Sequence, residues 1–187
     1  MEQIKKFDIK SKEVLKETFI LTGKIENNEI VNNLIYFIKN NINKDLSYKT
    51  HVKGKFTGFE SLNENIYFLM FLKLIKQEIY AIYKKNFVIG SVWGNILGIN
   101  EEVTEHTHGG VTAFCGTLYL SENGPGTYFK DYDITIEEEI GKYILFSPVL
   151  NHSVKKINND IERITVAFNM YELKEWEDKQ KIQWVNK

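Results

Sequence analysis

The stretch RITVAFN (residues 163–169) alternates between large apolar residues and polar or small ones. One set is Ile164, Val166 and Phe168, and the other is Arg163, Thr165, Ala167 and Asn169. Successive residues of a β-strand point to opposite faces, so the stretch predicts a strand with one buried apolar face. The other face carries an arginine beside a hydroxyl. The alternation fits a face in water and a face that lines a binding site equally well.

Four further β-rich runs, punctuated by glycine, precede this strand at 87–97, 112–121, 126–132 and 142–147. Short strands with turns and no helix between them predict an antiparallel sandwich or barrel. Earlier in the chain, apolar residues recur at helical spacing over 29–44 and 63–85. We therefore expect a mainly β protein with flanking helices, an α+β arrangement in which N-terminal helices brace a jelly-roll core.

The chain of 187 residues is predicted to be a single domain, because no repeat, low-complexity run or proline-rich linker divides it. We expect residues 1–85 to be mostly helical support and residues 86–172 to form the β core. Residues 173–187 are expected to form a C-terminal surface helix.

Charge and composition exclude several classes of partner. Lys and Arg total 24 against 25 for Asp and Glu, which leaves no positive excess for a phosphate backbone, so we expect no nucleic-acid partner. The most apolar stretch, residues 66–83, is interrupted by charges and predicts a buried helix, with no membrane partner. A single cysteine, Cys115, and the lack of a secretory signal favour a soluble cytoplasmic protein.

Three of the four histidines lie in the β-rich region: His106 and His108 in a His-Thr-His turn, and His152 further along. Residues two apart share a face of an extended segment, so His106 and His108 can point at one ion. With His152 from a distant strand they would form a set of three ligands with open positions, as in non-haem iron sites. A His-x-His pair alone is a weak signal, and its neighbours supply the context.

Arg163 is the only arginine in a chain whose other cations are lysines. Its planar guanidinium can give a carboxylate two parallel hydrogen bonds, and the hydroxyl of Thr165 can give a third. Because the pair lies one strand beyond His152, it predicts a carboxylate site beside the metal site.

Residues 93–171 resemble the double-stranded β-helix oxygenases that use Fe(II) and 2-oxoglutarate, and most closely their bacterial and phage members. The resemblance covers slightly under half of the chain, and the motifs in order are more specific than any one of them. They are Trp93-Gly94-Asn95, His106-Thr107-His108, Gly116-Thr117-Leu118-Tyr119-Leu120, Gly141-Lys142-Tyr143-Ile144-Leu145-Phe146-Ser147-Pro148, His152 and Arg163-Ile164-Thr165-Val166-Ala167-Phe168-Asn169.

The resemblance implies that Fe(II) is held by His106, His108 and His152. It also implies that 2-oxoglutarate chelates the metal and reaches Arg163 and Thr165 with its far carboxylate, with Tyr119 and Asn95 as further contacts to this cosubstrate. The implied reaction consumes O2 and 2-oxoglutarate, releases succinate and CO2, and hydroxylates a substrate that no motif identifies. The expected location is the cytoplasm, which for a phage-encoded protein is that of the host.

The chain departs from the family pattern at His108, where most members have Asp or Glu. Asp131 or Asp133 could supply the missing carboxylate, with His108 then serving beside the metal or toward the substrate. Glu105 is less suited, because it is adjacent to His106 and so faces the other side of a strand.

Two other functions remain open at this point. A three-histidine iron dioxygenase of the cupin type would activate O2 without 2-oxoglutarate, and it has no specific need for Arg163 and Thr165. A non-enzymatic jelly-roll module, with a binding or structural role, would need neither the metal nor the cosubstrate.

Overall fold

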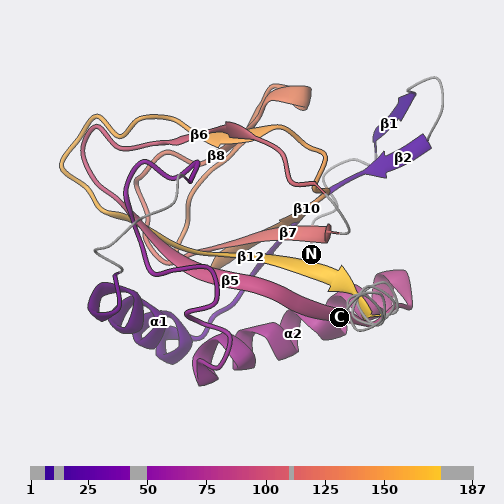
Figure 1. Cartoon of the computed structure of the whole chain (residues 1–187), viewed down its shortest axis with the longest axis horizontal. Helices are drawn as coiled ribbons and strands as arrows, with labels where there is room; N and C mark the ends of the chain where they lie inside the picture. The colour runs from indigo at the N-terminus through magenta and orange to yellow at the C-terminus, as the bar shows by residue number, and fades with distance from the viewer. Residues whose placement is uncertain (1–6, 11–14, 43–49, 110–111, 174–187) are drawn as a thin grey trace, which may run out of the picture.

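Two antiparallel β-sheets lie one above the other, and two helices cover the outer face of the larger sheet (Figure 1). The computed structural model describes residues 7–10, 15–42, 50–109 and 112–173. The major sheet has the strand order β3-β10-β7-β12-β5-β4, and the minor sheet has the order β6-β11-β8-β9. This confirms the prediction of a mainly β fold braced by helices.

The elements have the following bounds. The major sheet contains β3 (Ile20–Lys24), β4 (Lys55–Phe56), β5 (Phe87–Leu97), β7 (Thr112–Tyr119), β10 (Lys142–Phe146) and β12 (Arg163–Glu172). The minor sheet contains β6 (Val103–His106), β8 (Thr127–Phe129), β9 (Ile134–Ile136) and β11 (His152–Val154). Outside them lie the hairpin of β1 (Phe7–Lys10) and β2 (Leu15–Thr18), the helices α1 (Asn28–Asn40) and α2 (Ile66–Tyr83), and the 3-10 turn η1 (Lys130–Tyr132).

Both helices lie where the hydrophobic spacing predicts them, and each begins at an asparagine cap. Asn27 Oδ1 accepts a hydrogen bond from Ile30 N at 3.1 Å, and Asn65 Oδ1 accepts one from Phe68 N at 3.1 Å. These caps satisfy backbone donors that have no partner within the first turn. In the part of the chain that the structure describes, no helix combines the length and the apolar character needed to cross a bilayer.

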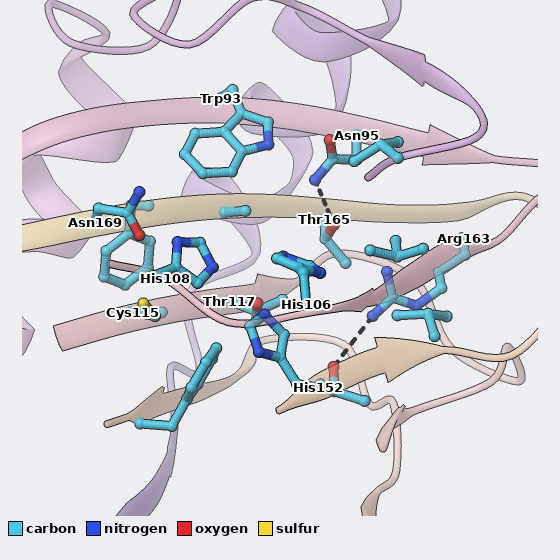
Figure 2. A pocket seen from close by; sticks show the side chains of 18 residues that line it. Trp93, Asn95, His106, His108, Cys115, Thr117, His152, Arg163, Thr165 and Asn169 are labelled. Atoms are coloured by element: carbon cyan, nitrogen blue, oxygen red, sulfur yellow. Dashed lines mark hydrogen bonds between the residues drawn. The ribbon is translucent and has the colours of Figure 1, made fainter. Parts of the chain in front are cut away.

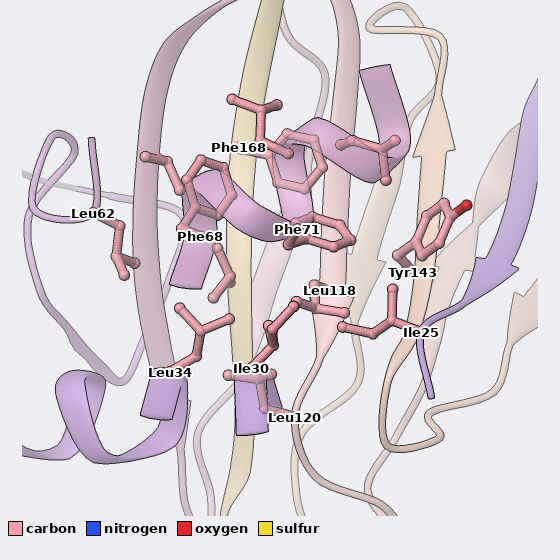
Figure 3. Packing of buried hydrophobic residues seen from close by; sticks show 14 of the residues in the cluster. Ile25, Ile30, Leu34, Leu62, Phe68, Phe71, Leu118, Leu120, Tyr143 and Phe168 are labelled. Carbon is pink, nitrogen blue, oxygen red and sulfur yellow. The ribbon is translucent and has the colours of Figure 1, made fainter. Parts of the chain in front are cut away.

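The main core fills the space between the helices and the outer face of the major sheet (Figure 3). Phe168 lies in it, with its ring centroid 5.8 Å from that of Phe68 and 5.9 Å from that of Phe71. Its cross-strand partner is Gly116, where a Cβ would come within 2.2 Å of the Phe168 ring. The ring therefore requires a glycine on β7, and the helices are fixed against this side of the sheet.

Strand β12 has the two faces that the alternation predicts. Its apolar residues pack into the main core, whereas the intervening residues line a cavity on the opposite face, between the sheets. Those cavity-lining residues are Arg163, Thr165, Ala167 and Asn169. The polar face of the strand therefore lines a site and does not lie in water.

The boundary expected at residue 86, between helical support and β core, does not match the composition of the major sheet. Strands β3 and β4, from the first 85 residues, form the two edges of the major sheet. The sequence pattern missed them: β4 has only two residues, too few for a period to be recognised, and β3 lies in the part of the chain where helical spacing dominates the pattern. The C-terminal helix expected over 173–187 lies almost wholly outside the described residues.

Candidate metal centre

Strand pairing in the minor sheet brings the three histidines of the β region together (Figure 2). His152 at the start of β11 is the cross-strand partner of His106 at the end of β6. His108 lies two residues after His106 in the sequence. The possible ligand atoms of the three imidazoles all lie within 4.8 Å of one another. The ring centroids of His106 and His152 are 4.2 Å apart. Strand pairing therefore places two of the three side chains next to each other, with their ring planes tilted by 50°.

Hydrogen bonds to the backbone fix the tautomer of two of these imidazoles. His106 Nδ1 is 2.8 Å from the carbonyl oxygen of Thr104, and His152 Nδ1 is 3.0 Å from that of Leu150. A carbonyl oxygen only accepts, so each Nδ1 carries the hydrogen and each Nε2 keeps its lone pair. Outer hydrogen bonds of this kind orient the histidine ligands of metal ions.

Burial keeps the three imidazoles neutral near pH 7. The pKa of His152 is lowered to about 3 and that of His108 to about 4, chiefly by burial and secondarily by the neighbouring imidazoles. The pKa of His106 is lowered mainly by burial as well. Metal ligation requires the neutral imidazole, so protons compete little for this set in the neutral pH range.

The described residues contribute no carboxylate to the cluster of ligand atoms. Asp131 and Asp133 are exposed, and their carboxylates accept hydrogen bonds from Asn151 N at 2.6 Å and Tyr128 Oη at 2.9 Å, respectively. Glu105 is exposed as well and forms an ion pair with Lys130 at 2.8 Å. The three nitrogen donors suit a divalent transition metal, with His108 as the third member of the set.

A cavity of about 70 Å³ extends from the histidines toward Arg163 (Figure 2). Three residues that the sequence singles out for a cosubstrate line it, namely Arg163, Thr165 and Asn95. Asn95 Nδ2 lies 3.5 Å from Thr165 Oγ1, and Asn95 Oδ1 is buried without a hydrogen-bond partner in the described structure. We call this space, between the imidazoles and Arg163, the inner cavity.

Tyr119 lies behind the guanidinium and is not part of the inner cavity's lining. Its hydroxyl donates to Thr127 Oγ1 at 2.7 Å, and Arg163 Cζ lies 5.4 Å from the centre of its ring. Tyr119 thus contacts Arg163, which in turn lines the cavity.

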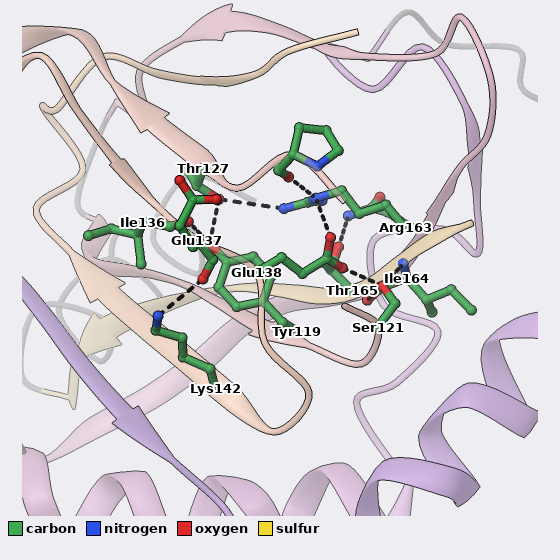
Figure 4. A network of polar contacts seen from close by, with 12 residues as sticks. Tyr119, Ser121, Thr127, Ile136, Glu137, Glu138, Lys142, Arg163, Ile164 and Thr165 are labelled. Carbon is green, nitrogen blue, oxygen red and sulfur yellow. Dashed lines mark hydrogen bonds and ion pairs between the residues drawn. The ribbon is translucent and has the colours of Figure 1, made fainter. Parts of the chain in front are cut away.

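Arg163 is held by a buried polar network that includes a carboxylate (Figure 4). Its Nε donates to Pro125 O at 2.9 Å and lies 4.0 Å from Glu138 Oε2. Glu138 accepts a short hydrogen bond from Ser121 through Oε1, while its Oε2 has no hydrogen-bond partner among the described residues. The positive charge at this end of the inner cavity is therefore partly balanced by the protein.

Glu138 lies in a run of three glutamates, a pattern typical of a solvated turn, and was therefore not predicted as a residue of the site. A signal was present nonetheless. The alternating positions 134, 136, 138 and 140 hold Ile, Ile, Glu and Ile, which places Glu138 in phase with apolar residues. Glu138 is buried, whereas its neighbours Glu137 and Glu139 are exposed.

Replacing Glu138 with glutamine is expected to change how stability depends on pH. Burial raises the pKa of Glu138, and the positive charge of Arg163 offsets this only in part. The folded chain therefore holds this proton more tightly than the unfolded chain. Its contribution to stability is complete below the ordinary pKa of 4.5 and is lost as the pH rises through the folded-state value. We expect Glu138→Gln to lose less stability than the parent as the pH rises from 4.5 to neutrality.

Urea denaturation at several pH values measures this difference. Glu137→Gln serves as the control, since the neighbouring carboxylate is exposed and its removal should leave the profile of the parent unchanged. Parallel pH profiles for Glu138→Gln and the parent would contradict the assigned pKa direction.

The fourth histidine, His51, also lies at the site, although it stands alone in the sequence. Its ring stacks on that of His106, with centroids 4.3 Å apart and planes within 2°. An isolated bridge between Val52 and Val103 brings its loop alongside β6. No local sequence pattern indicates this long-range contact, so His51 could not be predicted as a residue of the site.

Solved structures similar to this chain belong to 2-oxoglutarate and iron(II) oxygenases. The collagen prolyl hydroxylase of Paramecium bursaria Chlorella virus 1, solved with 2-oxoglutarate, has a TM-score of 0.64 and 15% identity over 81% of this chain and 96% of its own. For a prolyl-4-hydroxylase from Pseudomonas putida the TM-score is 0.63, with 13% identity over 82% and 92%. HygX from Streptomyces hygroscopicus, solved with nickel, 2-oxoglutarate and hygromycin B, has a TM-score of 0.61 and 11% identity over 83% of both chains.

No protein-family model and no curated protein sequence matches the chain. The structural likenesses establish that it has the double-stranded β-helix fold.

Proposed function

We propose that this protein is an Fe(II)- and 2-oxoglutarate-dependent dioxygenase that hydroxylates its substrate. The observation that carries the proposal is the inner cavity, which has three neutral imidazoles at one end and a buried arginine with a threonine at the other. A cosubstrate with a metal-chelating 2-oxo acid group at one end and a second carboxylate at the other has the chemistry to fill such a space.

In this proposal His106, His108 and His152 hold the iron, and Arg163 and Thr165 bind the far carboxylate of 2-oxoglutarate. Bound iron would supply the redox chemistry that couples the oxidative decarboxylation of 2-oxoglutarate to the oxidation of a C–H bond. The protein's own part is to keep the imidazoles neutral and oriented, to hold the cosubstrate, and to exclude water from the inner cavity.

The charges of the site support this assignment. Three neutral imidazoles leave the two positive charges of Fe(II) to be balanced by the two carboxylates of 2-oxoglutarate. Arg163 Nε lies 4.0 Å from Glu138 Oε2, so this carboxylate is within ion-pair distance of the guanidinium. A buried site in which opposite charges are paired avoids the cost of an unpaired charge.

A second candidate is the three-histidine iron dioxygenase that works without 2-oxoglutarate. The observation that favours it is the all-histidine donor set of the described residues. This second candidate does not explain why Arg163 and Thr165 are buried beside the cavity. We therefore prefer the first candidate.

Anaerobic titration of the purified, untagged protein with Fe(II) and then with 2-oxoglutarate tests the proposal. We expect one equivalent of iron to bind and a weak visible charge-transfer band to appear only when 2-oxoglutarate is added. Iron binding without the band, together with no succinate after exposure to O2, would favour the second candidate. Failure to retain iron would exclude both enzymes and favour the non-enzymatic module.

A further inference from the structure

A second cavity, of about 300 Å³, lies against the histidines and opens beside the loop that carries His51. We call it the outer cavity. It shares Val52, Trp93, His106, His108 and Asn169 with the lining of the inner cavity. The remaining lining residues are Thr50, His51, Phe56, Phe59, Thr107 and Gly109. A molecule in the outer cavity would therefore touch two of the three imidazoles without entering the space that leads to Arg163.

Aromatic rings make up much of the wall of the outer cavity. The rings of Phe59 and Trp93 meet edge to face, with centroids 5.0 Å apart and planes at 82°. Phe56 packs against Phe59 in the same manner, at 5.2 Å. Phe59 remains 41% exposed although it belongs to this cluster. Large aromatic faces that line a concave space are the principal source of binding energy for apolar and planar ligands.

The described residues that line the outer cavity include no carboxylate, ammonium or guanidinium group, because none of them is Lys, Arg, Asp or Glu. An ionised group that entered would lose hydration and gain no opposite charge from the wall. Its polar contacts would come from the hydroxyls of Thr50 and Thr107 and from Asn169, whose Oδ1 has no hydrogen-bond partner in the described structure.

We propose that the outer cavity binds the oxidisable substrate through an uncharged group with an apolar or aromatic face. The catalytic meaning of this inference rests on the proposed function, because only a metal held by the histidines would make the outer cavity a reaction site. Binding itself follows from the shape of the cavity, its aromatic wall and the absence of acidic and basic residues among the described residues that line it. Phe59 and His51 determine specificity in this proposal, since both line the outer cavity and neither lines the inner one.

Three small probes of similar size and different charge test the class of ligand. Indole is neutral and aromatic, choline is a cation that aromatic walls also attract, and benzoate is an aromatic anion. Saturation-transfer NMR of the metal-free protein measures their binding without the complication that benzoate ligates metals. We expect indole to bind and choline and benzoate to bind at least about tenfold more weakly. Benzoate finds no cationic side chain among the described lining residues, and choline finds ring faces but no carboxylate to offset its lost hydration.

Variants of the wall test the location. Phe59→Ala should weaken indole binding by roughly five- to tenfold, the size expected when an aromatic contact is lost. Ile140→Ala is the matched control, because Ile140 is 38% exposed and lines neither cavity. His51→Ala changes a second residue of the wall. The location of the indole site can therefore still be tested if Phe59→Ala fails to fold. Equal indole affinity in Phe59→Ala, His51→Ala and the parent would overturn the assigned location, and choline or benzoate binding as tightly as indole would overturn the assigned class.

A cobalt-loaded sample separates this inference from the proposed function. Co(II) in the histidine set should broaden the resonances of bound indole, whereas Zn(II) should not. Metal content is measured on the same samples. Metal that binds without broadening the indole signals would refute the outer cavity as the substrate site. A protein that retains no metal would refute the proposed function, and the variants would still decide where indole binds.

Discussion

Replacing His152 with alanine is expected to abolish metal binding. His152 is the most buried of the three histidines, and it is held opposite His106 by strand pairing. Its loss leaves two imidazoles that are two residues apart in the sequence. Loss of an outer hydrogen-bond partner of a ligand typically lowers metal affinity by about 10- to 100-fold, and loss of a ligand should cost more. Metal analysis after dialysis against Fe(II) or Zn(II) measures the effect.

His51→Ala is the matched control for this result. It removes an imidazole whose ring lies 4.3 Å from that of His106 but which does not belong to the set of converging ligand atoms. We expect His51→Ala to retain one equivalent of metal and His152→Ala to retain none. Full occupancy in His152→Ala would remove His152 from the proposed ligands, and equal losses in both variants would point to a general effect on the fold.

Replacing Arg163 with lysine is expected to weaken 2-oxoglutarate binding without removing the metal. The guanidinium donates to Pro125 O at 2.9 Å and contacts Thr127 Oγ1 at 3.5 Å. Its remaining N–H groups can form a bidentate pair with a carboxylate, which an ammonium group cannot do. Losing charge-assisted hydrogen bonds should cost about 1.5–3 kcal/mol, or roughly 10- to 150-fold in the dissociation constant.

Titration of the metal-loaded variant with 2-oxoglutarate measures this change. Because Arg163 is buried, its thermal unfolding should be compared with that of the parent, so that a loss of fold is recognised as such. Glu138→Gln is expected to tighten 2-oxoglutarate binding at a pH at which the Glu138 carboxylate is ionised, because that carboxylate lies 4.0 Å from the guanidinium. At a pH at which Glu138 is protonated the substitution should have little effect on binding. An unchanged dissociation constant in Arg163→Lys would remove Arg163 from the cosubstrate site and leave the proposed metal ligands unaffected.

Features that depend on local spacing could be predicted from the sequence. The alternation over residues 163–169 identified the strand and both of its faces, because side-chain direction in a strand repeats every two residues. The His-Thr-His turn placed two imidazoles near each other for the same reason. Both helices followed from the apolar spacing in the first half of the chain.

Features that depend on long-range packing could not be predicted in this way. His51 reaches the site through long-range contacts to β6, which include the bridge between Val52 and Val103 and a hydrogen bond from Thr104 N to His51 O at 2.9 Å. Nothing near His51 in the sequence indicates these contacts. The outer cavity joins the loop of residues 50–59 to β5 and β12, which are paired but distant in sequence. Tyr119, which is expected to contact the cosubstrate, lies against Arg163, and its hydroxyl donates to Thr127; this long-range arrangement has no local sequence signal.

The pairing of His152 with His106 across β11 and β6 has a consequence for metal selection. A donor set that the backbone assembles in advance needs little rearrangement to accept an ion, so the apoprotein should remain folded after treatment with a chelator. Three nitrogen donors also follow the general order of divalent-ion affinities, in which copper, nickel and zinc bind more tightly than ferrous iron. A site of this composition would therefore take up copper, nickel or zinc in preference to ferrous iron when these ions compete for it.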